Sequence, residues 1–326
     1  MTADDNKRKK SPVSLRISVT NRCQARCLYC TPEKYLKRNL KDVISFEEIL
    51  RFVRTLDRRY EVEKVRITGG EPLLRNGLVD LIGTLSDMGI GDIALTTNGQ
   101  SLKKQARSLK TAGLKRVNIS LDSLNPETFT KLTRGCELSR TLDGIDTAIA
   151  LGLTPVKINM VVMKDVNDGD IGEMANFGIE RGVQVRFLEL MPIGITDEQF
   201  KTWFVSSEVV MKRLSKTYAF TPLPVGVSHS SRNFTIENEQ GKTGIVGLIS
   251  PTTVPFCTGC RRLRLKADGK LVGCLARNNE YDIRPLLKDD QSVESPLFAE
   301  TIETALHTKN GYGCFSNKIP MAEIGG

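Results

Sequence analysis

The sequence predicts an α/β protein built on an open, partial (β/α)6 TIM-like barrel, followed by a smaller C-terminal α+β domain. Six strand-like segments alternate with helical segments through the first 200 residues, as expected for parallel strands joined by helices. These strand segments alternate apolar with polar side chains, whereas parallel strands covered by helices on both faces are usually apolar throughout. Six units are too few to close an eight-stranded barrel, so we expect the sheet to stay open.

The expected elements follow from periodicity, capping and turn residues. Ser45 is the N-cap of the first helix, and Glu48 completes a capping box with it. Further helices are expected over residues 77–88 and 171–181. In chain order, the six expected strands cover residues 15–20, 64–68, 92–96, 116–122, 155–162 and 183–190. After residue 197 we expect a helix over 206–214, strands over 233–237 and 244–249, and two helical stretches between 281 and 307.

Length and composition limit the classes to which the protein can belong. The 326 residues contain 40% hydrophobic and 26% charged residues, which is typical of a globular protein. No run approaches the roughly 18 apolar residues of a membrane span, and the polar N-terminus lacks a secretory apolar core, so we expect a cytoplasmic protein. We expect a disordered tail over 1–12, the barrel over 13–200, and a C-terminal domain over 201–326, which carries the cysteines Cys257, Cys260 and Cys274 and to which we assign substrate binding.

The formal net charge of +9 allows three interpretations. A solvated basic surface is the commonest cause of such a charge. Nucleic-acid binding is disfavoured, because aromatic residues make up only 6% of the chain and no nucleic-acid-binding signature is present. An anionic small-molecule substrate is the third, and it depends on where the arginines lie.

Arginine and lysine occupy polar positions within the expected strands. Arg16, Arg66, Lys157 and Arg186 each lie between apolar neighbours. One face of the sheet should therefore pack on helices, while the other lines a polar cavity. Active sites of such sheets lie at the carboxyl ends of the strands. The loop after the first strand and the turns Gly69–Pro72 and Thr97–Gly99 all fall at that edge.

The loop after the first strand carries Cys23, Cys27 and Cys30, spaced C-x3-C-x2-C. Three thiolates can hold three irons of a four-iron cluster and leave the fourth iron open. A structural zinc site prefers four ligands, so the zinc alternative needs a distant residue such as Cys136, Cys314 or a histidine.

A second group, Cys257, Cys260 and Cys274, also lacks an obvious fourth ligand. Taken alone it is equally consistent with a zinc ribbon. Two incomplete groups in one chain favour two clusters, each with an open iron. The neighbouring Arg262 and Arg264 form either a solvated charge run or an anion site, and beside a substrate-binding cluster we favour the anion site.

With Tyr29 before the third cysteine and Gly69–Pro72 after the second strand, the sequence resembles the radical S-adenosylmethionine (SAM) superfamily. From about residue 15 onward it resembles, within that superfamily, the GTP 3′,8-cyclase family of molybdenum-cofactor biosynthesis. The narrower resemblance rests on residues 15–20, 66–75, 95–99 and 118–122, on the second cysteine group with its arginines, and on the terminal Gly-Gly. Gln24 and Thr31 depart from the family pattern, in which Asn and Met are common.

The resemblance implies a role for each matching residue. The first 4Fe–4S cluster is held by Cys23, Cys27 and Cys30, and the second by Cys257, Cys260 and Cys274. SAM is contacted by Tyr29, Gly70, Ser120 and Met191. GTP is contacted by Arg16, Arg66, Thr96, Lys157, Arg262, Leu263 and Arg264, with Lys64 and Arg186 as lesser candidates for its triphosphate. The tail residues Gly325 and Gly326 reach into the active site.

The implied cofactors are two 4Fe–4S clusters and SAM. A 5′-deoxyadenosyl radical takes hydrogen from C3′ of GTP, and C3′ then bonds to C8, giving (8S)-3′,8-cyclo-7,8-dihydroguanosine 5′-triphosphate. Besides GTP, the implied partners are an electron donor and, by hand-over of product, cyclic pyranopterin monophosphate synthase, while a homodimer is a possible assembly. The alternatives are a peptide-modifying radical SAM enzyme with an auxiliary cluster and a zinc-dependent nucleic-acid-binding protein.

Overall fold

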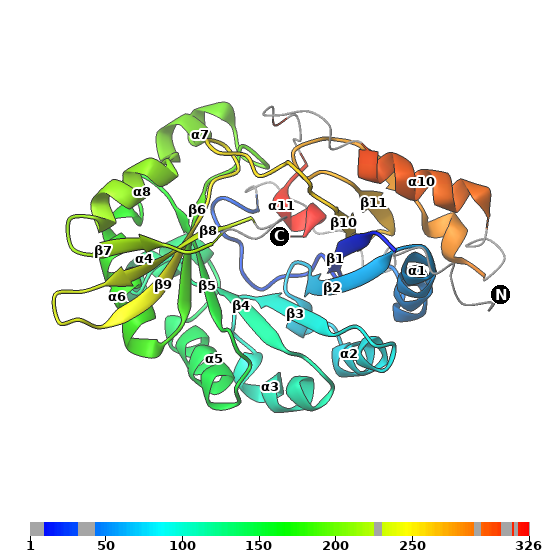
Figure 1. Cartoon of the computed structure of the whole chain (residues 1–326), viewed down its shortest axis with the longest axis horizontal. Coiled ribbons are helices and arrows are strands. Elements are labelled where there is room, and N and C mark those ends of the chain that lie inside the picture. The colour runs from blue at the N-terminus through cyan, green and yellow to red at the C-terminus, as the bar shows by residue number, and fades with distance from the viewer. Residues whose placement is uncertain are drawn as a thin grey trace, which may run out of the picture.

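The computed structural model describes residues 10–31, 43–224, 230–289, 295–307, 315 and 319–325. Its central feature is a twelve-stranded sheet bent into an open crescent (Figure 1). Helices α2, α3 and α5 lie outside the crescent, and the short helix α11 lies on its concave side (Figure 1). The predicted open α/β sheet is therefore confirmed.

All six predicted strands are present and pair in parallel, in sequence order. They are β1 Pro12–Ser18, β2 Glu61–Thr68, β3 Asp92–Thr97, β4 Arg116–Ser120, β5 Lys157–Val162 and β6 Gln184–Glu189. The helices that follow them are α1 Phe46–Arg59, α2 Leu78–Asp87, α3 Leu102–Thr111, α4 Pro126–Thr133, α5 Leu138–Ala150 and α6 Ile171–Arg181. Apolar strand residues such as Leu15 and Ile17 are fully buried in the core.

The strands of the C-terminal third extend the same sheet at both edges. After α7 Asp197–Trp203 and α8 Ser207–Leu214 come β7 Ala219–Pro222, β8 Arg232–Glu237, β9 Thr243–Ile249, β10 Arg262–Leu265, β11 Lys270–Val272 and β12 Glu280–Asp282. Strand β9 pairs in parallel with β6, and β10 pairs in parallel with β1. The row of parallel strands is therefore longer than six, and residues near 262 lie beside the first strand.

The two helical stretches expected between 281 and 307 are only partly present. Residues Glu280–Asp282 form β12, which pairs with β11, and Arg284–Leu287 form a short 3-10 helix. Only α10, Pro296–His307, is an α-helix in the described part of this region, and α11 covers Met321–Ile324. Pairing with β11 satisfies the backbone of residues 280–282, and such tertiary contacts override helix propensity.

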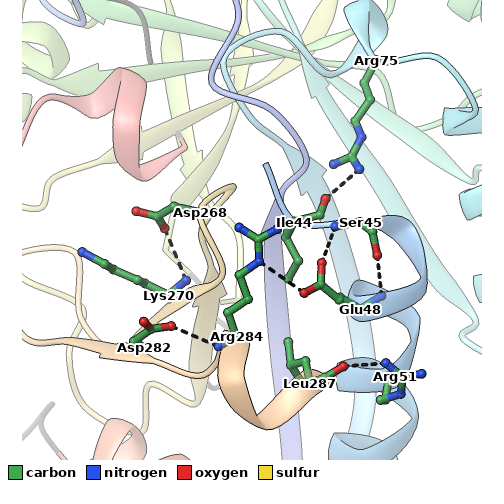
Figure 2. Close-up of polar contacts among 10 residues, drawn as sticks. All are labelled: Ile44, Ser45, Glu48, Arg51, Arg75, Asp268, Lys270, Asp282, Arg284 and Leu287. Atoms are coloured by element: carbon green, nitrogen blue, oxygen red, sulfur yellow. Dashed lines mark hydrogen bonds and ion pairs between the residues drawn. The ribbon is translucent and has the colours of Figure 1, made fainter. Parts of the chain in front are cut away.

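The predicted capping box at the start of α1 is confirmed and joins distant parts of the chain. Glu48 N donates to Ser45 Oγ at 3.1 Å, and Ser45 N donates to Glu48 Oε2 at 2.7 Å. Figure 2 shows Arg284 reaching the same glutamate, with Nε donating to Oε1 at 3.2 Å. In the same view Arg75 Nη2 donates to Ile44 O at 2.7 Å. Helix α1 is thus fixed both to the Gly69–Pro72 turn region and to the C-terminal third.

We expect Ser45→Ala to lower the free energy of unfolding by about 1 kcal/mol, because one helix donor loses its acceptor. Ser45→Gly is the matched control and should cost only a few tenths of a kcal/mol, since glycine is a tolerated N-cap. Chemical denaturation of both variants measures the difference. Equal stability of the alanine variant and the parent would contradict a contribution from this cap.

No helix within the described ranges combines the length and apolar character needed to cross a bilayer. The boundary proposed at residue 200 falls inside α7, Asp197–Trp203. Because strands on both sides of that boundary share one sheet, the division into a barrel and a C-terminal domain stays a proposal.

Candidate functional site

A cavity of about 360 Å³ is lined by both cysteine groups and by residues from strands β1 to β6 and β10. It extends from residues within the strands, such as Arg16 and Arg66, to the loops at their carboxyl ends, where active sites of such sheets are expected. Of the sequence-predicted residues, its lining includes Arg16, Cys23, Cys27, Tyr29, Cys30, Arg66, Gly70, Thr96, Ser120, Arg186, Met191, Cys257, Cys260, Arg262, Arg264 and Cys274. The structure therefore brings together residues that span most of the sequence.

Backbone hydrogen bonds hold the first cysteine loop against the end of α4. Arg26 N donates to Thr133 O at 2.8 Å, and Leu28 N donates to Leu132 O at 3.0 Å. Within the loop, Cys30 N donates to Cys27 O at 3.0 Å. The spacing of this group is thus fixed by contacts outside the cysteines themselves.

The chemistry of the first group fits a cluster. Burial raises the pKa of Cys23 to about 12 and that of Cys30 to about 11, and raises the pKa of Cys27 well above its usual range. Nearby carboxylates and neighbouring thiols add to these shifts. Three thiolates here need a strongly positive partner, which coordinated metal supplies.

The described donors do not surround a single ion position. Among the described residues, no three His, Cys, Asp or Glu side chains converge tightly enough to hold a single metal ion. A zinc ion needs its ligands about 2.3 Å away from one centre. The thiolates of a four-iron cluster bind separate irons and can stand further apart.

The hairpin of β10 and β11 brings the second group together. Cys257 and Cys260 precede β10, and Cys274 follows β11. Cys260 N donates to Cys257 O at 3.1 Å. Burial, with the neighbouring Cys274 and Cys260, raises the pKa of Cys257. All three cysteines line the same cavity as the first group.

Gly69 and Gly70 are required by contact with the chain itself. A Cβ on Gly70 would lie 2.3 Å from Arg22 O, and one on Gly69 would lie 2.6 Å from Thr20 O. Gly70 N donates to Thr20 O at 2.6 Å, so the turn packs directly on the start of the cysteine loop. The family resemblance implies a contact of Gly70 with SAM, and glycine lets the backbone approach a ligand closely. In the structure it also serves to join β2 to the cysteine loop.

A row of arginines crosses three neighbouring strands. In the parallel pairing of β1 with β2 and β10, Arg16 lies opposite both Arg66 and Arg264. Burial and the neighbouring guanidinium groups lower the pKa of Arg66 to about 9 and that of Arg264 to about 10. The pKa of Arg16 is lowered well below its usual range for the same reasons.

Several arginine nitrogens in the cavity lining lack an acceptor among the described residues. Arg66 Nε, Arg186 Nε and Arg264 Nη1 are buried without a hydrogen-bond partner among the described residues. Arg116, by contrast, is paired with Asp92 through two bonds of 2.8 and 2.6 Å. Buried charge without a partner is costly, so the arginine row favours an anionic ligand.

The two predicted lysines and Leu263 differ from these arginines. Lys157 does not line the cavity, and burial together with the nearby Arg186 lowers its pKa to about 7. Lys64 Nζ lies 3.4 Å from Asp92 Oδ2, which gives it a counter-charge already. Leu263 is fully buried in the hydrophobic core, so its side chain faces away from the cavity.

Gly325, in the C-terminal tail, lies against the first strand. A Cβ on Gly325 would lie 2.8 Å from Ser18 Cβ, and its φ of +83° favours glycine. Met321 of α11 lines the cavity, and Figure 1 shows α11 inside the crescent. Gly326, Cys314 and His229 lie outside the described residues.

Two buried carboxylates near the first cysteine group were not assigned a role from the sequence. Asp122 Oδ2 accepts from the Tyr29 hydroxyl at 2.8 Å, and burial raises the Asp122 pKa to about 6. Glu71 accepts from Thr97 Oγ1 at 2.7 Å, and burial raises its pKa to about 7. Their position in the sequence could have indicated a role, because each follows the carboxyl end of a strand, where active-site residues of such sheets lie.

Comparison with known proteins agrees with this site. The family model described as "Radical SAM superfamily" matches residues 17–178, and that described as "Molybdenum Cofactor Synthesis C" matches residues 183–313. The chain is 40% identical to the GTP 3′,8-cyclase of Alkaliphilus metalliredigens over 96% of this chain and 97% of the relative. It is 42% identical to that of Thermodesulfovibrio yellowstonii over 96% of this chain and 97% of the relative.

Among solved structures, Streptococcus suis SuiB bound to precursor peptide SuiA matches with a TM-score of 0.61. The match covers 90% of this chain and 67% of that one at 16% identity, which shows a shared fold alone. The two family models and the relatives near 40% identity identify the family, which the shared fold does not. This chain therefore belongs to the GTP 3′,8-cyclase family within the radical SAM superfamily.

Proposed function

We propose that this chain is a GTP 3′,8-cyclase that binds two 4Fe–4S clusters and SAM and catalyses the first step of molybdenum-cofactor biosynthesis. The first cluster is assigned to Cys23, Cys27 and Cys30, and the second to Cys257, Cys260 and Cys274. Both groups line one cavity, and burial raises the pKa of cysteines in each group. Support for the substrate comes from the curated relatives, which are named for GTP cyclisation.

The observation that carries the proposal is the arginine row of Arg16, Arg66 and Arg264. These side chains are buried on adjacent strands and lower one another's pKa. A triphosphate supplies the negative charge they lack, and guanidinium groups match phosphate oxygens well. The row and both cysteine groups line the same cavity, so a nucleotide held by the row would share that cavity with both groups.

SAM is assigned to the part of the cavity lined by Tyr29, Gly70, Ser120 and Met191. SAM at the first cluster supplies the radical that removes hydrogen from C3′ of GTP. The chain's own contribution is positioning and exclusion of water. Asp122 holds the Tyr29 hydroxyl at 2.8 Å, and Met321 of α11 covers the cavity from the tail side.

Anaerobic reconstitution tests this proposal. We expect roughly seven to eight irons per chain, the content of two four-iron clusters. With SAM and reductant present, 5′-deoxyadenosine formation should increase with GTP and not with ATP or a peptide pool. Stoichiometric zinc without iron would contradict both a GTP-cyclising and a peptide-modifying radical SAM enzyme. Turnover that depends on peptide would show that the substrate is a peptide and not GTP.

The affinity for GTP should fall as the pH rises above 7. Lys157, whose pKa is lowered to about 7, is charged below that pH and neutral above it. A neutral lysine no longer attracts a triphosphate, so the part of the affinity that Lys157 contributes from outside the cavity lining is lost as the pH rises through 7. Lys157→Arg keeps its charge and should remove this part of the profile, while the ionisation of GTP itself is common to both proteins. Calorimetric titration from pH 6 to 9 compares them, and superimposable profiles would exclude a role for Lys157.

Gly325→Ala should lower cyclisation on the order of 10²-fold, because a displaced tail alters positioning in the site. The added methyl would lie 2.8 Å from Ser18 Cβ on a backbone with φ of +83°. Iron content should match the parent. Gly241→Ala, at a turn with φ of +74° and no close neighbour within 3.4 Å, is the control and should retain activity. Full activity of the Gly325 variant would contradict a role for the tail.

The electron donor, hand-over to cyclic pyranopterin monophosphate synthase, a homodimer and a cytoplasmic location remain part of this proposal. The first three rest on the family resemblance and the location on the composition of the sequence, rather than on contacts within the chain. The same holds for the contributions of Thr96, Leu263, Lys64 and Gly326 to GTP binding or catalysis. For Leu263, burial of its side chain leaves only the backbone available to a ligand.

A further inference from the structure

Asn98, in the turn after β3, contacts a cysteine of the first group. Its Nδ2 lies 3.8 Å from Cys23 Sγ, within hydrogen-bond range for a sulfur acceptor. Hydrogen bonds to cysteine sulfurs are one determinant of the reduction potential of iron–sulfur clusters.

The orientation of the Asn98 amide is determined by its other partners. Oδ1 accepts from Gln24 Nε2 at 3.3 Å and from Gln100 N at 3.1 Å. An amide oxygen accepts and an amide nitrogen donates, so these two contacts direct Nδ2 toward the sulfur. Gln24 is one of the positions at which this sequence departs from the family pattern.

The backbone of Asn98 is fixed from two sides. Asn98 N donates to Glu71 Oε2 at 2.7 Å, and Asn98 O accepts from Thr141 Oγ1 at 2.9 Å. Glu71 is 1% exposed and belongs to the Gly69–Pro72 turn, which packs on the start of the cysteine loop. The turn, the cysteine loop and Asn98 therefore form one connected network.

We propose that Asn98 is a positioning residue that donates a hydrogen bond to the Cys23 thiolate and raises the reduction potential of the first cluster. Reduction adds negative charge that is shared with the thiolate ligands. A donor fixed at one sulfur stabilises the reduced state more than the oxidised state. This inference rests on the proposed assignment of the first cluster to Cys23, Cys27 and Cys30.

The test is a redox titration of the reconstituted, full-length enzyme followed by electron paramagnetic resonance. The signal of the first cluster is identified by its change when SAM is added. We expect Asn98→Leu, which keeps the volume and removes the donor, to make reduction about tenfold less favourable, or about 59 mV for a one-electron couple. Asn98→Asp should lower the potential further, because it places a carboxylate beside the thiolate.

Gln105→Leu is the matched control. Gln105 Nε2 donates to Leu73 O at 3.0 Å in the same region and makes no contact with a cysteine in the described structure. Its potential should equal that of the parent. If Asn98→Leu binds full iron and has the parent's potential, the proposal is wrong.

Loss of iron from both Asn98 variants, with the control intact, would assign Asn98 a folding role and also overturn the proposal. Failure of the proposed function is distinguishable from these outcomes, because the parent itself would then assemble no cluster.

Discussion

Replacing Arg264 with methionine should abolish GTP binding and at the same time stabilise the ligand-free protein. Arg264 is 6% exposed, its Nη1 lacks a hydrogen-bond partner within the described structure, and its pKa is lowered to about 10. Its charge also lowers the pKa of Arg16 more than any other neighbouring charge does. Replacing buried charge with apolar side chains of similar volume is often neutral or stabilising, by about 1–4 kcal/mol.

The loss of function follows from the same geometry. Without the Arg264 guanidinium, a triphosphate loses a donor aligned with Arg16 and Arg66 on adjacent strands. GTP at 100 times its Kd should stabilise the parent by about 2.7 kcal/mol, and should not stabilise the variant. Arg262→Ala and Arg264→Ala should likewise abolish cyclisation while both clusters assemble. Denaturation with and without GTP, together with iron analysis, measures each effect.

Arg116→Met is the control for this argument, because Arg116 is paired with Asp92 through bonds of 2.8 and 2.6 Å. Removing one member of a satisfied pair leaves a half-buried carboxylate whose remaining cation, among the described residues, is Lys64, so this variant should be less stable than the parent. The opposite signs expected for the two arginines distinguish a ligand site from a structural ion pair. A destabilised Arg264→Met that still binds GTP would show that the arginine row serves the fold.

The pattern of residues over short stretches of sequence was sufficient to predict the strands and the best-capped helices. Alternation identified all six strands of the barrel, and Ser45 with Glu48 located the start of α1. Alternation also placed Arg16 and Arg66 on a polar face, and both line the cavity. These features depend on residues close together in sequence, where backbone geometry sets the period.

The pairing of strands that lie far apart in the sequence could not be predicted from short stretches of residues. The four-residue strand β10 joins β1 in parallel, and nothing within Arg262–Leu265 specifies a partner about 250 residues earlier. The resemblance connected Arg262 and Arg264 with the substrate, but the physical reason is this pairing, which places Arg264 opposite Arg16. Likewise, residues 280–282 form a strand because β11 is available to pair with them.

Replacing Cys257, Cys260 and Cys274 together with alanine should separate radical formation from cyclisation. Iron should fall from about eight to about four per chain, since the first group remains. SAM should still be cleaved to 5′-deoxyadenosine at a slow, GTP-independent rate, because the first group lies on a different loop, held by Thr133 and Leu132. Cyclised product should fall at least about 10²-fold, because the nucleotide loses the positioning that the second group supplies.

The reciprocal substitution of Cys23, Cys27 and Cys30 supplies the control. It should also leave about four irons, but it should eliminate 5′-deoxyadenosine along with the product. The arginine row is intact in both variants, so GTP should still stabilise the variant that lacks the first group. Unchanged cyclisation without the second group would show that Cys257, Cys260 and Cys274 have a structural role, whereas half the iron with product lost would assign them to the substrate.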